Sequence, residues 1–335
     1  MKNSPENNLP LVSVIIPCRN EEKYIGECLD SLVSQDYPKE NLEVLVVDGM
    51  SEDRTREVIE KFKIPRTRAF GTVRGRQNLT SNIQLMDNPK KFTPFGLNIG
   101  IKNAKGEIII RMDAHATYER DYISKCVKYL NEYDADNVGG IIKTLPAKNT
   151  LVDKAIATCL SSPFGAASDF RVGSNQPKET DTVFGGCYKK EVFDRIGLFN
   201  ENLIRSQDME FNLRLKKAGG KILLAPDIVT YYYPKSNLKD FFLHTFEDGI
   251  WAIYPLKFVK IPFKLRHYIP LIFVLTLPLS IWPYILLSLF FSAQIAFREK
   301  DFRLFFVEPL AFGSRHFAYG LGSIWGLLTL KKIKK

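Results

Sequence analysis

Short apolar runs alternate with helical patterns over the first ~110 residues of the chain. The run from Val12 to Ile16 predicts a buried strand, which Pro17 ends. Asn20 is then expected to cap a helix whose apolar positions fall at helical spacing: Ile25, Leu29, Leu32 and Val33. Alternation of this kind is typical of strand-helix-strand units in a parallel sheet. The chain is therefore predicted to begin with an α/β domain.

A second strand and helix follow the same pattern. The strand from Leu42 to Val47 ends at Asp48, and Ser51 is expected to cap a helix from Glu52 to Phe62. In open parallel sheets, ligands bind at the carboxyl ends of the strands, where helix N-termini offer N–H donors to phosphate. Asp48 is therefore a candidate to accept a hydrogen bond from a pyrimidine N–H or a ribose hydroxyl.

A third apolar run, Glu107 to Met112, places Asp113 and His115 at another strand end. Because residues two apart in extended chain point to the same side, both side chains can share a divalent cation. Taken alone, the pair is slightly better explained by an aspartate that caps the next helix beside an ordinary polar histidine. Its place at a strand end favours the cation site, since a metal there can offset charge on a diphosphate.

The middle of the chain gives weaker patterns. Residues 66 to 95 are rich in Arg, Asn, Gly and Pro and stay unassigned, apart from a helix expected to include Ser81 to Met86. Ile141 and Ile142 continue the sheet. Residues 145 to 182 are polar and contain glycine, so a mobile loop region is predicted there.

The segment from Ser206 to Gly219 predicts a helix with acidic residues in its first turn, Asp208 and Glu210. A carboxylate at this position can act as a general base towards a hydroxyl group. Alternatively, both acids only complement the helix dipole, which is the commoner case for such residues in isolation.

An uncharged run of 29 residues, Ile269 to Phe297, exceeds the ~20 residues that cross a bilayer core. A second apolar segment, Leu304 to Leu330, contains Glu308, Arg315 and His316 and is more amphipathic. Two crossings and hairpins that do not cross fully both remain open, since basic residues flank the pair on both sides. The C-terminal region is predicted to be membrane-associated.

The net charge of +10 is concentrated around these apolar segments. Eight basic residues flank them, as expected beside anionic headgroups: Lys257, Lys260, Lys264, Arg266, Lys331, Lys332, Lys334 and Lys335. The sequence has no basic strand motif interleaved with aromatics and no zinc-finger or helix-turn-helix spacing, so no nucleic-acid partner is expected.

Five cysteines without a CxxC pair predict neither a zinc site nor a disulfide framework. Met1 to Pro10 is polar, so the N-terminal domain is expected on the cytoplasmic side.

Three segments in this order and spacing resemble glycosyltransferase family 2 over most of residues 12 to 225. They are VSVIIPCRNEEKYIGECLDSLVSQDYP with VVDGMSEDRT, then RMDAHATY, then GGCYKKEVFDRIGLFNENLIRSQDMEFNLRLKKAG. The resemblance is strongest to bacterial succinoglycan-type exopolysaccharide glucosyltransferases. It implies a GT-A fold with a Rossmann-like, mostly parallel sheet, a nucleotide-diphosphate sugar donor, a Mg or Mn ion, and inverting transfer by direct displacement.

Matching positions imply roles for individual residues. The nucleotide would be held by four residues: Pro17, Arg19, Glu21 and Asp48. Asp113 and His115 would take the metal and the diphosphate, and Asp208 would be the catalytic base. The backbone of Gly185 and Gly186 would approach the sugar or the acceptor closely.

Two positions depart from the family pattern. His115 stands where many relatives have a second acid, and imidazole suits Mn or Zn better than Mg. Gln207, a further candidate for substrate binding, stands where many relatives have glutamate.

A QxxRW-type motif of processive synthases is absent, because FEDGIW, Phe246 to Trp251, has a tryptophan but no Gln and Arg. Single-sugar transfer is therefore expected.

Residues 1 to 240 are expected to form the GT-A domain, and residues 241 to 335 the membrane-associated region. The predicted reaction moves a sugar, glucose from UDP-glucose, onto a polyprenyl-linked saccharide at the cytoplasmic face of the cell membrane. One rival is a nucleotidyltransferase, which needs a glycine- and lysine-rich phosphate loop where this chain has PCRNEEKY. The other is a non-catalytic membrane scaffold, which is expected to have lost Asp113 or Asp208.

Overall fold

The computed structural model describes residues 9–63, 82–166, 168–258 and 264–332. The polar segment up to residue 8, residues 66–81, Lys260, Lys334 and Lys335 lie outside the described residues. The chain forms two compact units. Unit 1 comprises Met1–Gly140, Gln176–Glu201 and Arg214–Thr230, and unit 2 comprises Ile141–Asn175, Asn202–Leu213 and Tyr231–Lys335. The division into residues 1–240 and 241–335 stays a prediction.

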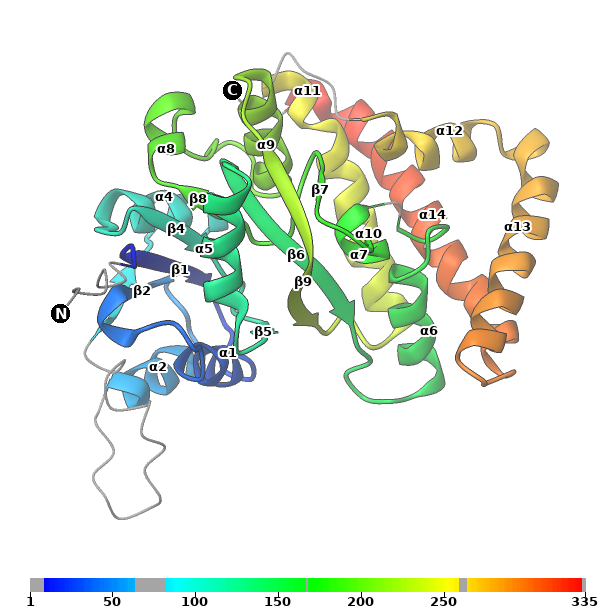
Figure 1. Cartoon of the computed structure of the whole chain (residues 1–335). Helices are drawn as coiled ribbons and strands as arrows, with labels where there is room; N and C mark the ends of the chain where they lie inside the picture. The colour runs from blue at the N-terminus through cyan, green and yellow to red at the C-terminus, as the bar shows by residue number, and fades with distance from the viewer. Residues whose placement is uncertain (1–8, 64–81, 167, 259–263, 333–335) are drawn as a thin grey trace. The chain divides into compact units, whose positions relative to one another are not determined.

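A mixed sheet runs through the described residues in the order β3-β2-β1-β4-β8-β6-β9-β5, with β7 beside β9 (Figure 1). Its first four strands are β3 (Ile83–Asp87), β2 (Leu42–Asp48), β1 (Val12–Cys18) and β4 (Ile108–Arg111). The others are β8 (Cys187–Lys189), β6 (Asn137–Thr144), β9 (Ile222–Tyr232), β5 (Ala116–Tyr118) and β7 (Lys178–Glu179). The first four run parallel, so their carboxyl ends share one edge. β8 runs antiparallel to β4 and to β6.

The central strands are apolar because both faces of the sheet are covered. Every residue of β2 is buried, and the core of unit 1 includes Val14, Ile16, Val44 and Val46. Strands covered on both faces become continuous apolar runs, which the sequence pattern showed. The surrounding helices are α1 (Ile25–Val33), α2 (Thr55–Lys63), α4 (Thr93–Asn103), α5 (Tyr122–Glu132) and α8 (Glu191–Ile196).

Two helices of unit 1 begin later than predicted. Tyr24 occupies the N-cap position of α1, whereas Asn20 has a left-handed φ of 56° and its Oδ1 accepts a hydrogen bond from Glu52 N at 2.9 Å. Helix α2 begins at Thr55, and the Ser51 hydroxyl donates to Asp48 Oδ1 instead of capping that helix. The predicted caps at Asn20 and Ser51 are wrong because both side chains bond across the loops at the strand ends.

Two further local predictions are wrong. Ser81 lies outside the described residues, and Ile83–Asp87 is strand β3, since pairing with β2 overrides the local pattern. The predicted loop at 145–182 contains helices α6 (Leu151–Leu160) and α7 (Asp169–Val172) and strand β7. Thr150 caps α6, and the helix buries Ile156 and Leu160 against Phe241, a contact invisible to local pattern.

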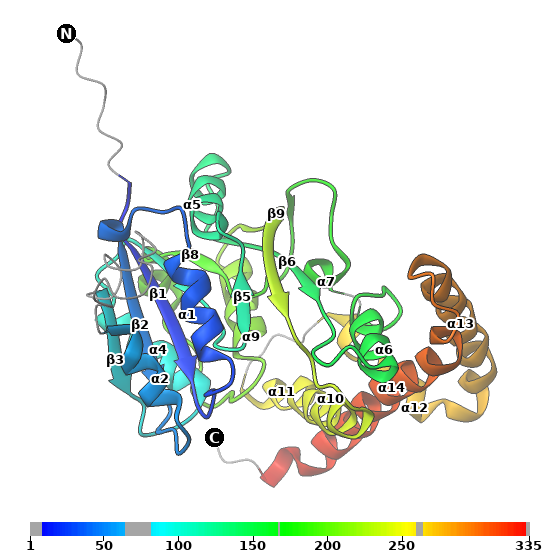
Figure 2. The ribbon, with the colours of Figure 1, turned by 90° about the horizontal axis from the view of Figure 1, so that it is seen from below.

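The helices of unit 2 surround one long helix, α14 (Leu304–Thr329) (Figure 2). It packs against α6, α10 (Leu238–Ile253), α12 (Ile269–Leu275) and α13 (Leu277–Arg298). A Cβ on Gly249 would lie 2.1 Å from Tyr319 O, and a Cβ on Gly322 2.0 Å from Phe246 O. Glycine at both positions therefore lets α10 and α14 approach at their backbones.

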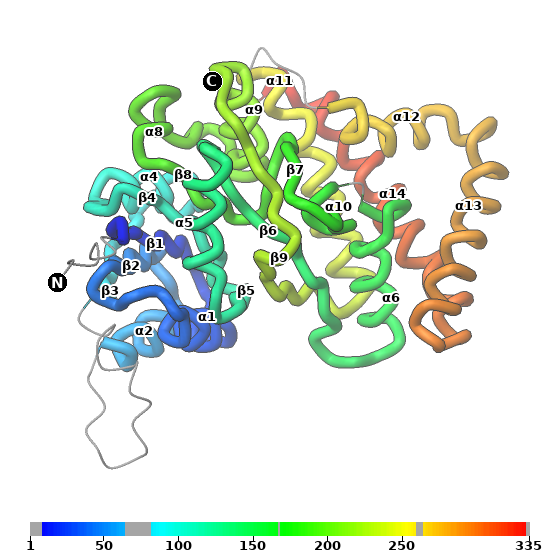
Figure 3. The backbone as a smooth tube through the Cα atoms, viewed as in Figure 1, coloured from blue at the N-terminus to red at the C-terminus, as the bar shows by residue number. Residues whose placement is uncertain are grey.

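The 29-residue apolar run forms two helices. Helix α12 ends at Leu275, and the backbone turns at Thr276 into α13, which has Pro278 in its first turn (Figure 3). Among the described helices, α13 alone is long and apolar enough to cross a membrane, and 22% of its apolar window is buried. Glu308 of α14 is fully buried. The C-terminal region is thus helical with one apolar candidate span.

Candidate active site

The loops after β1 and β2 are fastened to each other by side chains. Ser51 Oγ accepts from Asn20 N at 2.9 Å, and Thr55 Oγ1 accepts from Glu21 N at 2.7 Å. Gly49 is required between them, because a Cβ there would lie 2.8 Å from Lys91 O. Arg19 reaches Glu52 at 3.8 Å from the same loop. These bonds fix the edge of the sheet at which Pro17, Arg19 and Glu21 were predicted to bind a nucleotide.

Asp48 is fully buried at the end of β2 and already has several partners. Ser51 N and Arg56 Nη1 donate to its Oδ2 at 3.0 and 2.9 Å, and Ser51 Oγ donates to its Oδ1 at 2.5 Å. Arg56 also binds Asp87 Oδ1 at 2.8 Å, and the Asp87 side chain is 60% exposed at the end of β3. Asp48 thus shapes the edge of the sheet, while Asp87 presents the more accessible carboxylate.

Asp113 lies just beyond β4 and is held there by several contacts. Arg111 Nη2 donates to Asp113 Oδ1 at 3.0 Å, and Asp113 N donates to the Tyr118 hydroxyl at 2.7 Å. Burial would raise the pKa of Asp113, but the charges of Arg111 and His115 and the hydrogen bond from Arg111 outweigh it. The pKa of Asp113 is therefore below its ordinary value, and the carboxylate is ionised at neutral pH.

His115 follows Asp113 and faces the loop after β1. Its Nδ1 lies 3.2 Å from Glu21 Oε1. Among the described residues, no three acid, histidine or cysteine side chains cluster closely enough to hold a metal by themselves. Asp113 and His115 offer two side-chain ligands, which fits a cation that takes its remaining ligands from phosphate oxygens and water. A cation site at Asp113 and His115 stays a prediction.

Gly185 and Gly186 lie beside the end of β4. Both have left-handed φ angles, 70° and 100°, and Arg111 N donates to Gly186 O at 3.0 Å. A Cβ on Gly185 would lie 2.9 Å from Arg111 O, and one on Gly186 2.6 Å from the Tyr188 ring. No side chain fits at either position, so unit 1 brings this glycine pair to the strand end from which Asp113 projects.

Asp208, Gln207 and Glu210 belong to unit 2, in the first turn of α9 (Gln207–Lys217). Asp208 is half-buried, and its Oδ1 accepts from Met209 N at 2.9 Å. Glu210 is only 2% exposed. Gln207 is 6% exposed, and its Oε1 has no hydrogen-bond partner among the residues that the structure describes. Within that part of the chain, this oxygen is therefore a buried acceptor without a donor.

A charged network in unit 2 anchors the residues before Asp208. Ser206 has a left-handed φ of 60°, and its hydroxyl donates to Trp251 O at 3.0 Å. Arg205 Nη1 binds Asp248 Oδ1 at 3.1 Å, and Arg315 Nη1 of α14 binds the other oxygen of Asp248 at 3.2 Å. One carboxylate on α10 therefore ties α14 to the segment that precedes Asp208.

Sequence reasoning missed three residues of these groups. Arg111 stands two residues before Asp113, and an arginine beside an acid at a strand end was a usable signal. Asp87 was not identified as a strand-end acid, because the segment before it was predicted as helix. Arg56 lies within α2, and only the fold shows that it joins Asp48 to Asp87.

Residues 13–197 match the family model described as Glycosyl transferase family 2. A relative from Methanococcus voltae is 34% identical to this chain over 71% of the chain and 71% of its own length. It is the dolichyl N-acetyl-alpha-D-glucosaminyl phosphate 3-beta-D-2,3-diacetamido-2,3-dideoxy-beta-D-glucuronosyltransferase of that organism. The succinoglycan biosynthesis protein ExoA of Rhizobium meliloti is 27% identical over 70% of this chain and 67% of its own length.

The fold also matches a solved structure, the mannosyltransferase PcManGT from Pyrobaculum calidifontis in complex with GDP-Man and Mn²⁺. The TM-score is 0.62 at 21% identity, over 94% of this chain and 87% of that chain. The predicted α/β GT-A fold with a helical C-terminal region is confirmed. Because the family model covers more than half of the chain, this protein belongs to glycosyl transferase family 2.

Proposed function

We propose that this protein is an inverting glycosyltransferase that moves a hexose, glucose from UDP-glucose, onto a lipid-linked saccharide at the cytoplasmic face of the cell membrane. The observation that carries the proposal is the Asp113 carboxylate, held by Arg111 just beyond β4, where Arg111 N also binds Gly186 O of the glycine pair. The names of two relatives support the acceptor class. One concerns a dolichyl-linked sugar phosphate and the other succinoglycan biosynthesis.

In the proposed reaction, an acceptor hydroxyl attacks the anomeric carbon from the face opposite the leaving nucleoside diphosphate. The new glycosidic C–O bond forms as the bond to the phosphate oxygen breaks, so the anomeric configuration inverts. Asp208 takes the proton of the attacking hydroxyl. Arg111 keeps Asp113 ionised and oriented, and Pro17, Arg19, Glu21 and Asp48 form the nucleotide end of the site.

A divalent cation, Mn²⁺ or Mg²⁺, held by Asp113 and His115 would offset the charge that develops on the leaving diphosphate. The backbone at Gly185 and Gly186 leaves room for the sugar, because neither residue has a side chain. Gln207 directly precedes Asp208 in the first turn of α9, which is the reason for assigning it to substrate binding.

The membrane part of the proposal rests on unit 2. Helix α13 is apolar and long enough to cross a bilayer, whereas α14 packs along α10, which carries Asp240, Glu247 and Asp248. A crossing by α14 would take these charges towards the hydrocarbon core, which is costly. We therefore propose that α14 lies at the membrane surface and that α13 attaches the enzyme to its lipid-borne acceptor.

The Asp248 network gives a prediction about catalysis. In Asp248→Asn, Arg205 and Arg315 lose their shared counter-ion, so the segment before Asp208 should become less ordered. We expect kcat for sugar transfer to fall roughly fivefold to tenfold, as for loss of hydrogen bonds to a charged group, with the donor KM unchanged. Steady-state kinetics check this. Glu247→Gln, which loses a contact with Arg205 alone, should have a smaller effect, and equal effects would refute the bridging role.

Product analysis tests the proposed function. Membranes containing the purified protein are incubated with a panel of radiolabelled nucleotide sugars, and lipid-linked products are extracted. We expect one donor to label the lipid fraction and to release a nucleoside diphosphate, with UDP-glucose giving the highest rate. Release of pyrophosphate would identify a nucleotidyltransferase, and no product from any donor would favour a non-catalytic scaffold.

A further inference from the structure

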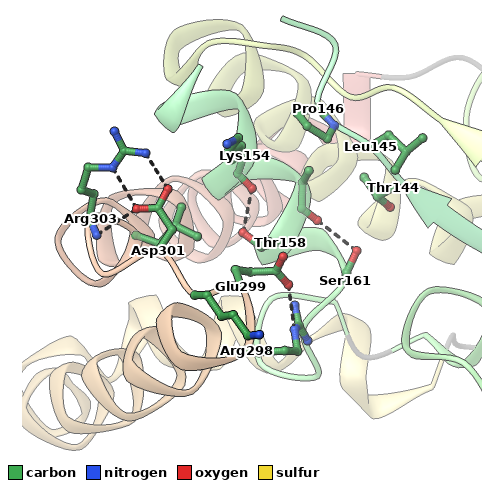
Figure 4. Close-up of a pocket in the computed structure, with 13 residues that line it drawn as sticks. Thr144, Leu145, Pro146, Lys154, Thr158, Ser161, Arg298, Glu299, Asp301 and Arg303 are labelled. Carbon is green, nitrogen blue, oxygen red and sulfur yellow. Dashed lines mark hydrogen bonds and ion pairs between the residues drawn. The ribbon is translucent and has the colours of Figure 1, made fainter. Parts of the chain in front are cut away.

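Unit 2 contains a cavity of about 530 Å³ whose lining includes none of the residues assigned above to sugar transfer (Figure 4). The end of β6, one face of α6, the C-terminal end of α13 and the start of α14 form its wall. Lys154, Thr158 and Ser161 reach it from α6. The volume lies within the ~300–1,000 Å³ that is typical of small-molecule sites.

The cavity wall carries more positive than negative charge. Four basic side chains line it: Lys154, Arg298, Lys300 and Arg303. The two acids already have partners, since Arg298 Nε donates to Glu299 Oε1 at 2.9 Å and Arg303 binds both oxygens of Asp301 at 2.8 Å. With four basic and two acidic side chains, the lining of the cavity has a net charge of +2. Within the described part of the chain, Lys154 and Lys300 form no ion pair at contact distance. The hydrogen bond from Arg303 lowers the pKa of Asp301, and the charge of Lys154 helps to lower it.

The backbone at Lys300 is left-handed, as it is at six other non-glycine residues in the described part of the chain. Its φ is 55°, in the left-handed region that favours glycine. Lys300 N donates to Phe297 O at 3.3 Å, and Asp301 N donates to Ala296 O at 3.1 Å. This is the Schellman ending of a helix, in which the left-handed residue is usually glycine. A lysine here is less favourable than a glycine would be, so replacing Lys300 with glycine should not destabilise the turn.

Exposed aromatic rings lie next to these cations in the chain. Phe297, Phe302 and Phe306 are 69%, 65% and 75% exposed, and the first two rings are 5.4 Å apart. Apolar rings interleaved with basic residues are typical of segments at a membrane surface. Helix α13, the candidate membrane span, ends at this turn. The anion that pairs with the two lysines is therefore expected to be part of a membrane lipid.

We propose that this cavity binds the phosphate group of an anionic membrane lipid. Lys154 and Lys300 pair with the phosphate oxygens. The Thr144 hydroxyl accepts a hydrogen bond from Arg171 at 3.3 Å and keeps its own proton to donate to the phosphate. The exposed rings of the turn enter the region beneath the headgroups. The site fixes the α13–α14 turn at the membrane surface and is independent of the sugar donor.

Vesicle flotation of the full-length protein tests this site. Vesicles of phosphatidylcholine alone are compared with vesicles that also contain phosphatidylglycerol. We expect the wild-type protein to bind the anionic vesicles more tightly. Lys154→Gln and Lys300→Gly should each weaken that binding roughly fivefold, and the double variant about 30-fold, while binding to neutral vesicles stays unchanged.

The Lys300→Gly variant carries its own control for folding. Glycine relieves the left-handed strain, so its unfolding temperature should equal or exceed that of the wild type, and lost binding cannot be ascribed to misfolding. Lys239→Gln, which removes an exposed charge from α10, should leave vesicle binding unchanged.

Inorganic phosphate without vesicles distinguishes the two sources of the anion. The lipid assignment predicts that phosphate does not raise the unfolding temperature of the wild type above that of the double variant. If phosphate stabilises only the wild type, and vesicle binding is equal in both proteins, the cavity takes free phosphate and the lipid assignment is overturned. Equal binding of both proteins to anionic vesicles, without any phosphate effect, also overturns the site.

Discussion

Asp208→Asn is expected to abolish sugar transfer while donor binding stays nearly intact. Asparagine keeps the shape of the side chain and the acceptor for Met209 N, but it cannot take a proton from an attacking hydroxyl. General-base catalysis contributes roughly 10²–10⁴-fold to rates, so kcat should fall by about that factor. Steady-state transfer rates and titration of the nucleotide sugar measure the two effects separately.

The neighbouring acid Glu210 provides the comparison for Asp208. Both acids lie in the first turn of α9, but Glu210 is only 2% exposed, whereas Asp208 is half-buried. Glu210→Gln should therefore retain transfer if the protein folds, which thermal unfolding checks. Transfer that survives in Asp208→Asn would show that Asp208 is not the base, and loss of transfer in a folded Glu210→Gln would move the role to that residue.

Asp113→Ala is expected to weaken donor binding and metal binding together. The change removes the ionised carboxylate at the end of β4 and leaves Arg111, whose side chain is 10% exposed, without its acid. Asp113→Asn keeps the side-chain shape and an acceptor for Arg111, so it separates the charge from the packing. In both variants we expect the dissociation constant for the nucleotide sugar to rise roughly 10- to 100-fold, with Mn²⁺ needed at higher concentration.

Calorimetric titration of the nucleotide sugar at several Mn²⁺ concentrations makes this measurement. Asp121→Asn is a suitable control, because Asp121 is an exposed acid of unit 1 that pairs with Lys125. It should leave both affinities unchanged. An Asp113→Asn protein with wild-type dependence on Mn²⁺ would refute a role for Asp113 in holding the cation.

The sequence was sufficient for β1, β2 and β4, three of the four strands in the parallel part of the sheet. The runs at Val12–Ile16 and Leu42–Val47 are mainly apolar because both faces of the sheet are covered. β2 ends at Asp48 as predicted, whereas β1 continues through Pro17, its predicted end, to Cys18. The same patterns placed Asp48 and Asp113 at strand ends and Asp208 in the first turn of a helix. The catalytic and binding roles of these residues stay predictions.

Interactions between distant residues account for the errors. Asn20 and Ser51 are good helix caps in any local reading, yet their side chains bond to backbone and side-chain partners across two loops. Residues 83–87 form a strand because β2 offers a parallel edge. Helix α6 is stabilised by burial of its apolar side against Phe241 and α14.

By itself, the sequence determined strands β1, β2 and β4, the apolar character of the C-terminal region and the candidate acids, because these depend on residues close together in the chain. Only the tertiary structure decided that Arg56 joins Asp48 to Asp87, that Arg111 holds Asp113, and that Asp248 joins Arg205 to Arg315. Arg111 and Asp113 are neighbours in the chain, but the other two sets of contacts depend on which segments pack together. Charges that face one another across a fold leave no periodic trace in the sequence.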